Sequence, residues 1–235
     1  MRKNYAVIAA GGLGTRLKDY DKNDHTKVLI DINGISMISL QVKQLISWGF
    51  TNFIIITNFE FNDMIQNDVH SNFEGIHTEF VIQESPDGIA DALSYASSKI
   101  PPDSLVTFVL GDNFFGENPL KEIDLEDFRG AHIFVKEVKN PSEFGVIELH
   151  KNKIINIHEK PKVYISSLAV VGLYVYEYSC FEYINSLKPS NRGELEITDL
   201  NKVYMSNKLL HFQTLESWWI DAGTEDRIEE LKKLI

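Results

Sequence analysis

The chain has 235 residues, 43% of them hydrophobic and 11% aromatic, and these values are typical of a folded globular protein. Its formal net charge of −11 argues against a surface for nucleic acid or anionic membrane, because both require a basic face. A single cysteine, Cys180, excludes an internal disulfide, and no apolar run approaches the ~20 residues of a membrane span, so we expect a cytoplasmic protein.

The first predicted element is a buried parallel strand over residues 5–9, an apolar run with β-branched content. Residues 11–16 follow as Gly-Gly-Leu-Gly-Thr-Arg, where the glycines allow a sharp turn and Arg16 offers the cationic fork that phosphate oxygens prefer. Because α/β sheets bind anions where a strand ends in such a loop, we expect a phosphate site here. The dinucleotide fingerprint would need a third glycine at Leu17, and no P-loop G-K-[ST] triplet occurs. On the loop alone, a glycine turn without a ligand stays open.

Lys27 ends a polar loop over residues 18–26. It is placed to reach back to the glycine loop, although in isolation an ordinary solvated lysine is the simpler interpretation. The next elements are predicted as a strand over 28–32, a helix over 38–46 that ends before Gly49, a strand over 53–57, a helix over 59–69 and a strand over 78–83.

Gln83 ends that last strand, and Pro86 and Gly88 fix a turn before a helix that begins at Ile89. A glutamine amide has both a donor and an acceptor, as a pyrimidine edge has, and a glycine lets backbone groups approach a base without a Cβ in the way. The alternative is a strand-end glutamine and a loop glycine that only form a turn.

A fourth buried strand, over 104–110, runs into Gly111, Asp112 and Asn113. A carboxylate at the C-terminal end of a central strand lies where α/β folds hold Mg²⁺ and nucleotide phosphates. An Asx turn that closes the strand is the alternative.

Strand and helix have now alternated four times, but the order changes after residue 130. Strands are predicted over 131–137, 144–149, 154–158, 168–176 and 209–215, with helices beginning at Ser179, Gly193 and Thr224. The fold class is therefore α/β, a Rossmann-like doubly wound, mostly parallel (mixed) sheet with an added β-rich lobe. We expect one domain over 1–235, with a core over about 1–130 and the β-rich portion with the closing helices over about 131–235.

Several short motifs appear in a fixed order along the chain. They are Gly-Gly-Leu-Gly-Thr-Arg-Leu at 11–17, Lys27, Gln-x-x-Pro-x-Gly at 83–88, Gly-Asp-Asn at 111–113, Phe-Gly-Val-Ile at 144–147, Glu-Lys-Pro at 159–161, Ala-Val-Val-Gly at 169–172, Gly-Glu-Leu-Glu-Ile-Thr-Asp at 193–199 and Trp-Ile-Asp-Ala-Gly-Thr at 219–224. This set resembles the sugar nucleotidyltransferases, most closely the thymidylyltransferase branch, which joins dTTP and glucose 1-phosphate. The implied activity is attack by a sugar 1-phosphate on the α-phosphate, with Mg²⁺ as cofactor and pyrophosphate as leaving group, in sugar-nucleotide biosynthesis.

The resemblance implies a nucleotide-binding core over about 1–130 and a sugar-phosphate-binding portion over about 131–235, and it assigns roles residue by residue. It implies that Gly11, Gly14, Thr15, Arg16, Lys27, Gln83, Gly88 and Asn113 bind the nucleotide, with Arg16, Lys27 and Asp112 catalytic. It implies that Asp112 and Asp221 hold Mg²⁺, and that Gly145, Glu159, Lys160, Val170 and Gly172 line the sugar-phosphate pocket.

Two departures from the family pattern concern specificity. Val28 stands where glutamine is common, and Val171 interrupts the usual Ala-Val-Thr-Gly, so the exact sugar stays open. Long members of the family continue beyond the position of Ile235, so we expect a short form without feedback control; the resemblance is also compatible with a homo-oligomer.

Three other functions compete with this interpretation. A uridylyltransferase that uses UTP fits almost equally well, since Gln83 would read uracil in the same way. A non-catalytic sugar-nucleotide-binding regulatory protein would be expected to lack Arg16, Lys27 or an aspartate, and all are present. A Rossmann oxidoreductase is disfavoured by the missing third glycine.

Overall fold

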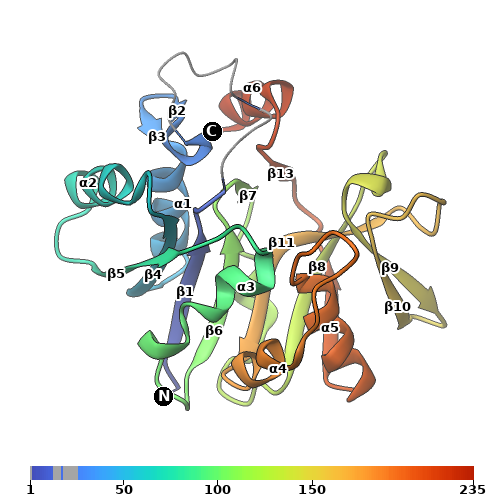
Figure 1. Cartoon of the computed structure of the whole chain (residues 1–235). Helices are drawn as coiled ribbons and strands as arrows, with labels where there is room; N and C mark the ends of the chain where they lie inside the picture. The colour runs from blue at the N-terminus through green and yellow to red at the C-terminus, as the bar shows by residue number, and fades with distance from the viewer. Residues whose placement is uncertain (1, 13–16, 18–25) are drawn as a thin grey trace.

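The computed structural model describes residues 2–12, 17 and 26–235. Its main sheet contains β1 (Asn4–Ala9), which pairs in parallel with β4 (Asn52–Asn58) on one side and with β6 (Leu105–Leu110) on the other. β5 (His77–Gln83) extends this parallel part beyond β4. The strands β1 and β6 run upward from the N-terminal side in Figure 1, so their carboxyl ends meet at the upper edge.

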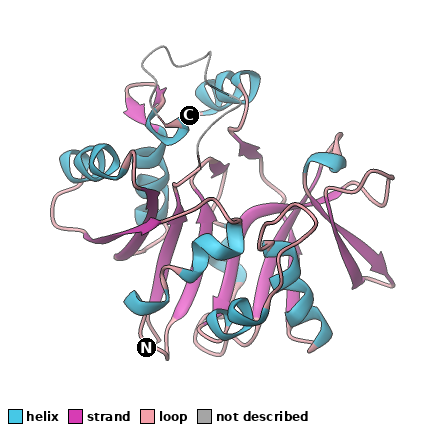
Figure 2. Cartoon of the chain, viewed as in Figure 1, coloured by secondary structure: helices cyan, strands magenta, loops and turns pink. Residues whose placement is uncertain are grey.

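The other half of the sheet is mostly antiparallel. β11 (Leu168–Glu177) pairs antiparallel with β6 and also with β8 (Ala131–Glu137) and β9 (Gly145–His150). β10 (Lys153–Glu159) forms a hairpin with β9, and β12 (Leu210–Thr214) pairs in parallel with β8. The hairpin projects to the right in Figure 2. Nine strands of the described chain thus form one mixed sheet, which confirms the predicted fold class.

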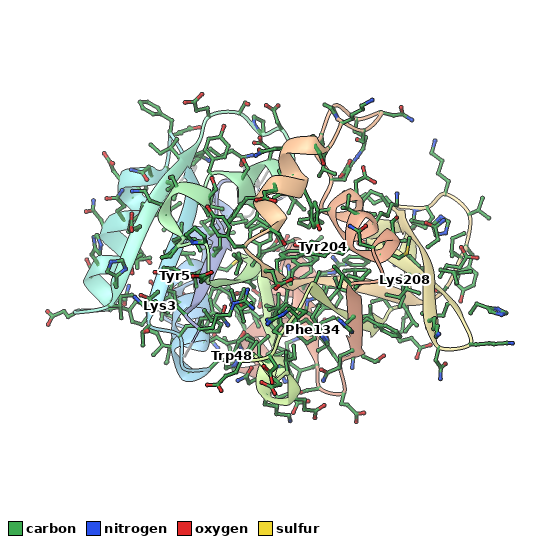
Figure 3. All side chains as sticks on the ribbon, turned by 90° about the horizontal axis from the view of Figure 1, so that it is seen from below. Lys3, Tyr5, Trp48, Phe134, Tyr204 and Lys208 are labelled. Carbon is green, nitrogen blue, oxygen red and sulfur yellow. The ribbon has the colours of Figure 1, made fainter. Side chains whose placement is uncertain are left out.

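Helices cover both faces of this sheet, and each face has its own hydrophobic cluster. One face carries α1 (Met37–Ser47) and α2 (Asn62–Asn72); the other carries α3 (Ile89–Ser94), α4 (Cys180–Ser186) and α5 (Ile197–Ser206). Successive β1 residues alternate between the clusters, as the period of a strand requires: Val7 packs with α3–α5, and Ile8 packs with α1 and α2. Tyr204 and Phe134, labelled in Figure 3, belong to these two clusters respectively.

A third, smaller cluster lies at the upper edge in Figure 1. It joins α6 (Glu225–Leu234) to the small hairpin of β2 (Asp31–Ile32) and β3 (Ile35–Ser36), and to the two-stranded pairing of β7 (Asn113–Phe115) with β13 (Trp219–Asp221). This cluster fixes the backbone that follows β6 against a segment from near the end of the chain. In the described part of the chain, no helix is long and apolar enough to cross a membrane.

Two local predictions are wrong. Residues 28–32 are not one strand: a 3-10 turn, η2 (Lys27–Leu29), precedes the two-residue β2. The segment from Gly193 is not yet helical, because α5 begins only at Ile197. Leu195 instead pairs its backbone with other chain segments, donating its N–H to Asp87 O (2.7 Å) and accepting from Ala90 N (3.1 Å).

Candidate active site

The two predicted metal ligands come together after β6. Asp112 directly precedes β7, and Asp221 is the last residue of β13, where it lies opposite Asn113 in the antiparallel register. The N–H of Ala222 donates to the carbonyl of Asp112 (2.8 Å), which fixes the two segments side by side. Two carboxylates far apart in the sequence therefore stand on adjacent backbones.

The Asp112 carboxylate is held by two donors. Lys27 Nζ forms an ion pair with its Oδ2, and Asn113 Nδ2 donates to its Oδ1 (2.8 Å). Burial raises the pKa of Asp112, but the charge of Lys27 and these hydrogen bonds oppose it, and the net pKa lies below its ordinary value. The carboxylate is thus ionised at neutral pH.

Asn113 connects Asp112, at the predicted metal site, to Gly172 on β11. The residue is 2% exposed, its Oδ1 accepts from Gly172 N (2.9 Å) and from Trp219 Nε1 (2.7 Å), and its amide nitrogen donates to Asp112. A Cβ on Gly172 would lie 2.7 Å from this carboxamide, so only glycine lets β11 approach so closely. In the structure Asn113 acts on the site through Asp112, and its predicted contact with nucleotide stays a prediction.

Asp221 also has a cationic partner. Arg227 Nη1, from the first turns of α6, lies 3.5 Å from Asp221 Oδ2, and its Nη2 donates to Glu143 (2.7 Å). The guanidinium stands 5.5 Å from the centroid of the Phe144 ring, a cation–π distance. Arg227 therefore orients the second carboxylate, a role that the sequence did not suggest.

The glycine turn packs tightly where it is described. A Cβ on Gly11 would lie 3.2 Å from the backbone of Thr57, and Asn58 at the end of β4 donates to the carbonyl of Gly11 (3.0 Å). Thr26 Oγ1 donates to the carbonyl of Gly12 (3.3 Å), so the segment that carries Lys27 lies beside this turn. Gly14, Thr15 and Arg16 lie outside the described residues, and their predicted roles stay predictions.

Gln83 and Gly88 lie together at the end of β5. Gln83 Nε2 donates to Asp91 Oδ2 (2.8 Å) and to the carbonyl of Gly88 (3.3 Å). Gly88 has φ +117°, and its Cβ would lie 2.4 Å from Leu195 O. The glycine is therefore required by packing of the 188–196 segment as well as by its left-handed backbone, a reason that the sequence did not reveal.

Three of the predicted sugar residues, Gly145, Glu159 and Val170, form a second cluster on β9, β10 and β11, whereas Gly172 lies against Asn113. Thr198 Oγ1 donates to Glu159 Oε2 (2.5 Å). A Cβ on Gly145 would lie 3.0 Å from Thr198 Oγ1, 3.5 Å from Glu159 Oε2 and 3.9 Å from Val170 Cβ. The structure thus brings Gly145, Glu159 and Val170 together, and Thr198 completes the group.

Cations surround Glu159. Lys160 Nζ lies 3.9 Å from Glu159 Oε1, and Arg192 Nη2 lies 3.6 Å from it. Arg192 also forms a bidentate pair with Glu196, in which Nε donates to Oε1 (3.1 Å) and Nη2 donates to Oε2 (2.8 Å). Glu196 is 5% exposed and closes the loop before α5, so this ion pair fixes the segment that leads to Thr198.

Sequence reasoning missed Thr198, Arg192 and Trp219 as site residues. Thr198 and Trp219 stand inside motifs that the sequence analysis quoted, so the motif positions were a usable signal. Arg192 stands one residue before such a motif, and no local pattern marks it.

One cavity adjoins the site. It has a volume of about 390 Å³ and lies between residues 136–140 and 218–221, with Phe144 and Arg227 in its wall. It contains Asp221 but neither Glu159 nor Gln83, so it lies beside the metal-binding end. In the described ranges, no group of three or more His, Cys, Asp or Glu residues is arranged to hold a metal.

The geometry agrees with a comparison of the whole sequence, in which the profile of the family described as nucleotidyl transferase matches residues 5–235. The chain belongs to the nucleotidyl transferase family. Glucose-1-phosphate thymidylyltransferase from Neisseria meningitidis is 36% identical over 97% of this chain and 81% of its own length. A crystal structure of a Bacillus anthracis protein, assigned as a glucose-1-phosphate thymidylyltransferase and bound to sucrose, superposes with a TM-score of 0.89 at 35% identity, covering 98% of this chain and 94% of that one.

A more distant structure shows how far the fold extends. UDP-glucose pyrophosphorylase in complex with UDP-glucose superposes with a TM-score of 0.83 at 19% identity, over 99% of this chain and 98% of that one. This similarity is one of fold alone. Together the comparisons identify a nucleotidyltransferase enzyme of sugar-nucleotide biosynthesis.

Proposed function

We propose that this chain transfers the thymidylyl group of dTTP to a sugar 1-phosphate, with glucose 1-phosphate as the natural acceptor. The observation that carries the proposal is the continuous hydrogen-bonded connection from Asp112 through Asn113 to Gly172 on β11, the strand that also carries Val170 of the sugar cluster. The relatives that are named for dTTP-dependent activity on glucose 1-phosphate support the choice of substrates.

The reaction would require alignment and charge neutralisation rather than a protein base. An oxygen of the sugar phosphate is already anionic, so it attacks the α-phosphorus directly. A new P–O bond forms, the bond from the α-phosphorus to the bridging oxygen breaks, and pyrophosphate leaves with that electron pair. Lys27, and Arg16 as the resemblance implies, would balance charge on the departing group.

The donors present fit Mg²⁺. Asp112 and Asp221 offer hard carboxylate oxygens on adjacent backbones, and Mg²⁺ is ordinarily bound by one or two carboxylates together with substrate phosphates and water. When bound, the ion would neutralise charge that develops on the α-phosphate. The chain's own contribution is to hold Asp112 through Asn113 and Asp221 through Arg227.

For the sugar, Glu159 would accept hydroxyl hydrogen bonds, and Lys160 would pair with the phosphate. Gly145 leaves room beside the hydrogen bond between Glu159 and Thr198. For the base, Gln83 would exchange its contact with Asp91 for the pyrimidine edge.

Pyrophosphate release tests the proposal. The purified chain is assayed with dTTP, UTP, CTP and GTP against a panel of sugar 1-phosphates. The highest kcat/KM is expected for dTTP with glucose 1-phosphate, and Asp112→Asn and Asp221→Asn should each lower it about a hundredfold or more. A clear preference for UTP would favour a uridylyltransferase instead, the second candidate, because Gln83 presents the same amide to uracil. Release of no pyrophosphate from any pair would contradict both.

A further inference from the structure

The ion pair of Lys27 with Asp112 uses the carboxylate that the proposed function assigns to the cation. Lys27 Nζ contacts Asp112 Oδ2, and Asn113 occupies Oδ1, so both carboxylate oxygens are engaged by the chain itself. The two side chains are only 20% and 14% exposed, so the pair is shielded from bulk water. A cation that joins Asp112 must therefore share or displace one of these donors.

The two donors differ in freedom to move. Asn113 is buried on β7 and is fixed by Gly172 and Trp219, so it cannot leave without breaking two further hydrogen bonds. Lys27 begins a short 3-10 turn and carries its ammonium on a flexible four-carbon stem. Lys27 is therefore the donor that a cation can displace from Asp112.

Local packing places Lys27 between the Asp112 carboxylate and the glycine turn. A Cβ on Gly111 would lie 3.3 Å from Val28 Cγ1, so the glycine before Asp112 lets the turn that carries Lys27 pack close to the end of β6. On the other side, Thr26 is hydrogen-bonded to the carbonyl of Gly12 in the glycine turn. A small movement of the Lys27 side chain would carry its charge from the carboxylate to a phosphate held at that turn.

We propose that Lys27 occupies the place of the divalent cation on Asp112 in the nucleotide-free enzyme, and that the cation and the triphosphate bind together because phosphate draws Lys27 away. The inference rests on the proposed function, since it requires a triphosphate at the glycine turn and a cation at Asp112. Mg²⁺ requires its ligand oxygens at 2.0–2.1 Å. At that distance the ion would occupy the lone-pair position on Asp112 to which the Lys27 ammonium donates, so the two cations compete. By linkage, the triphosphate then raises metal affinity by the same factor by which the metal raises triphosphate affinity.

The direct test is Mn²⁺ binding to the whole chain, measured by electron paramagnetic resonance of free Mn²⁺ without nucleotide. Lys27→Met removes the ammonium and keeps most of the stem, and its Mn²⁺ affinity should exceed that of the wild type by about tenfold or more. Lys99→Met is the matched control: it removes the same charge from an ion pair with Glu79 (2.7 Å) and should leave Mn²⁺ affinity unchanged. Adding Asp112→Asn to Lys27→Met should abolish this increase in Mn²⁺ affinity.

A second measurement keeps the test valid if the variant is less stable. Lys27→Met leaves a buried carboxylate without its ammonium, so its Tm should fall, and Mn²⁺ should restore it by more than it raises the wild-type Tm. Equal or weaker Mn²⁺ affinity in Lys27→Met, with no greater rise in Tm, would overturn the proposal.

Titrations with dTTP, without a sugar phosphate and corrected for Mn²⁺ bound by free dTTP, separate the two ideas. If Mn²⁺ binds at Asp112 with dTTP but Lys27→Met does not change nucleotide-free affinity, the competition with Lys27 is wrong and the proposed metal site stands. If wild type and variant bind no Mn²⁺ even with dTTP, the metal site itself is wrong, and the inference fails with it.

Discussion

Replacing Asn113 with aspartate tests the hydrogen-bonded connection at the centre of the site. Asn113→Asp changes one NH₂ group to oxygen and keeps the size of the side chain. The acceptor oxygen can still receive Gly172 N and Trp219 Nε1. The other position, which donated to Asp112 at 2.8 Å, now brings a second carboxylate against the first.

The cost follows from protonation. Two carboxylates at this distance cannot both stay ionised in a buried site, so the pair takes up a proton and the hydrogen bond is restored. At pH 7, protonating a group whose ordinary pKa is about 3.9 costs about 4 kcal/mol, at 1.36 kcal/mol per unit. We therefore expect Asn113→Asp to lower the free energy of unfolding by about 3–4 kcal/mol at pH 7.

The sign of the pH dependence is specific to this cause. The folded variant binds a proton that its unfolded chain lacks, so the deficit should shrink by about 1.4 kcal/mol for each unit that the pH falls from 7 toward 5. Urea unfolding of variant and wild type at pH 5, 6, 7 and 8 measures it. Asn118→Asp is the matched control, because Asn118 uses only its acceptor oxygen, toward Leu120 N (2.9 Å), and should change stability by less than about 0.5 kcal/mol. If Asn113→Asp has the same free energy of unfolding as wild type at pH 7, or if its loss does not change with pH, the reasoning is refuted.

Three further predictions concern packing, the sugar cluster and pH. Gly88→Ala should lower the free energy of unfolding by about 2 kcal/mol or more in urea titrations, because φ is +117° and the new Cβ would lie 2.4 Å from Leu195 O; stability equal to wild type would contradict the close approach. Thr198→Val removes the donor to Glu159 and should raise KM for the sugar phosphate severalfold with KM for the nucleotide unchanged; equal rises in both would count against a sugar role. Burial, and then the charge of a neighbouring histidine, lower the pKa of His132 from 6.5 to about 4, so the unfolded chain binds more protons between these values and stability is lost as the pH falls through this window. When the free energy of unfolding is measured against pH, His132→Phe should lose about 3 kcal/mol less of it than wild type between pH 6.5 and 4. Equal losses in variant and wild type would exclude this histidine as a source of acid sensitivity.

The elements with strong periodicity were predictable from the sequence. Residues 131–137 were predicted as a strand and form β8 with those bounds, because Ala131, Ile133 and Val135 pack into one hydrophobic cluster and Phe134 packs into the other. The helix ending before Gly49 is also confirmed: α1 ends at Ser47, and Gly49 has φ +94° as a residue that follows a helix.

Segments stabilised by distant partners were not predictable. The apolar run at 28–32 has the composition of a strand, but Val28 and Ile32 enter two different clusters, and a turn between them satisfies both. The helix predicted from Ser179 begins at Cys180, and the Ser179 hydroxyl does not cap it: this residue already has helical φ and ψ, and its Oγ lies near Tyr204 Oη (3.4 Å).

The site was predictable as a set of residues and not as a set of contacts. Motif order selected Asp112 and Asp221, but the pairing of the three-residue strands β7 and β13 that joins them depends on contacts across half the chain. Likewise, Asn113 was assigned to the nucleotide, and only the fold reveals that its carboxamide is already bonded to Asp112, Gly172 and Trp219.

The most direct test of the account is the position of a bound cation. Crystals of the whole chain grown with Mn²⁺ and dTTP, and measured at a wavelength where manganese scatters anomalously, would locate the ion without reference to any assumed role. We predict one peak within about 2.5 Å of carboxylate oxygens of both Asp112 and Asp221, with Lys27 moved off Asp112. A peak bound to phosphate oxygens alone, with neither aspartate in contact, would contradict it.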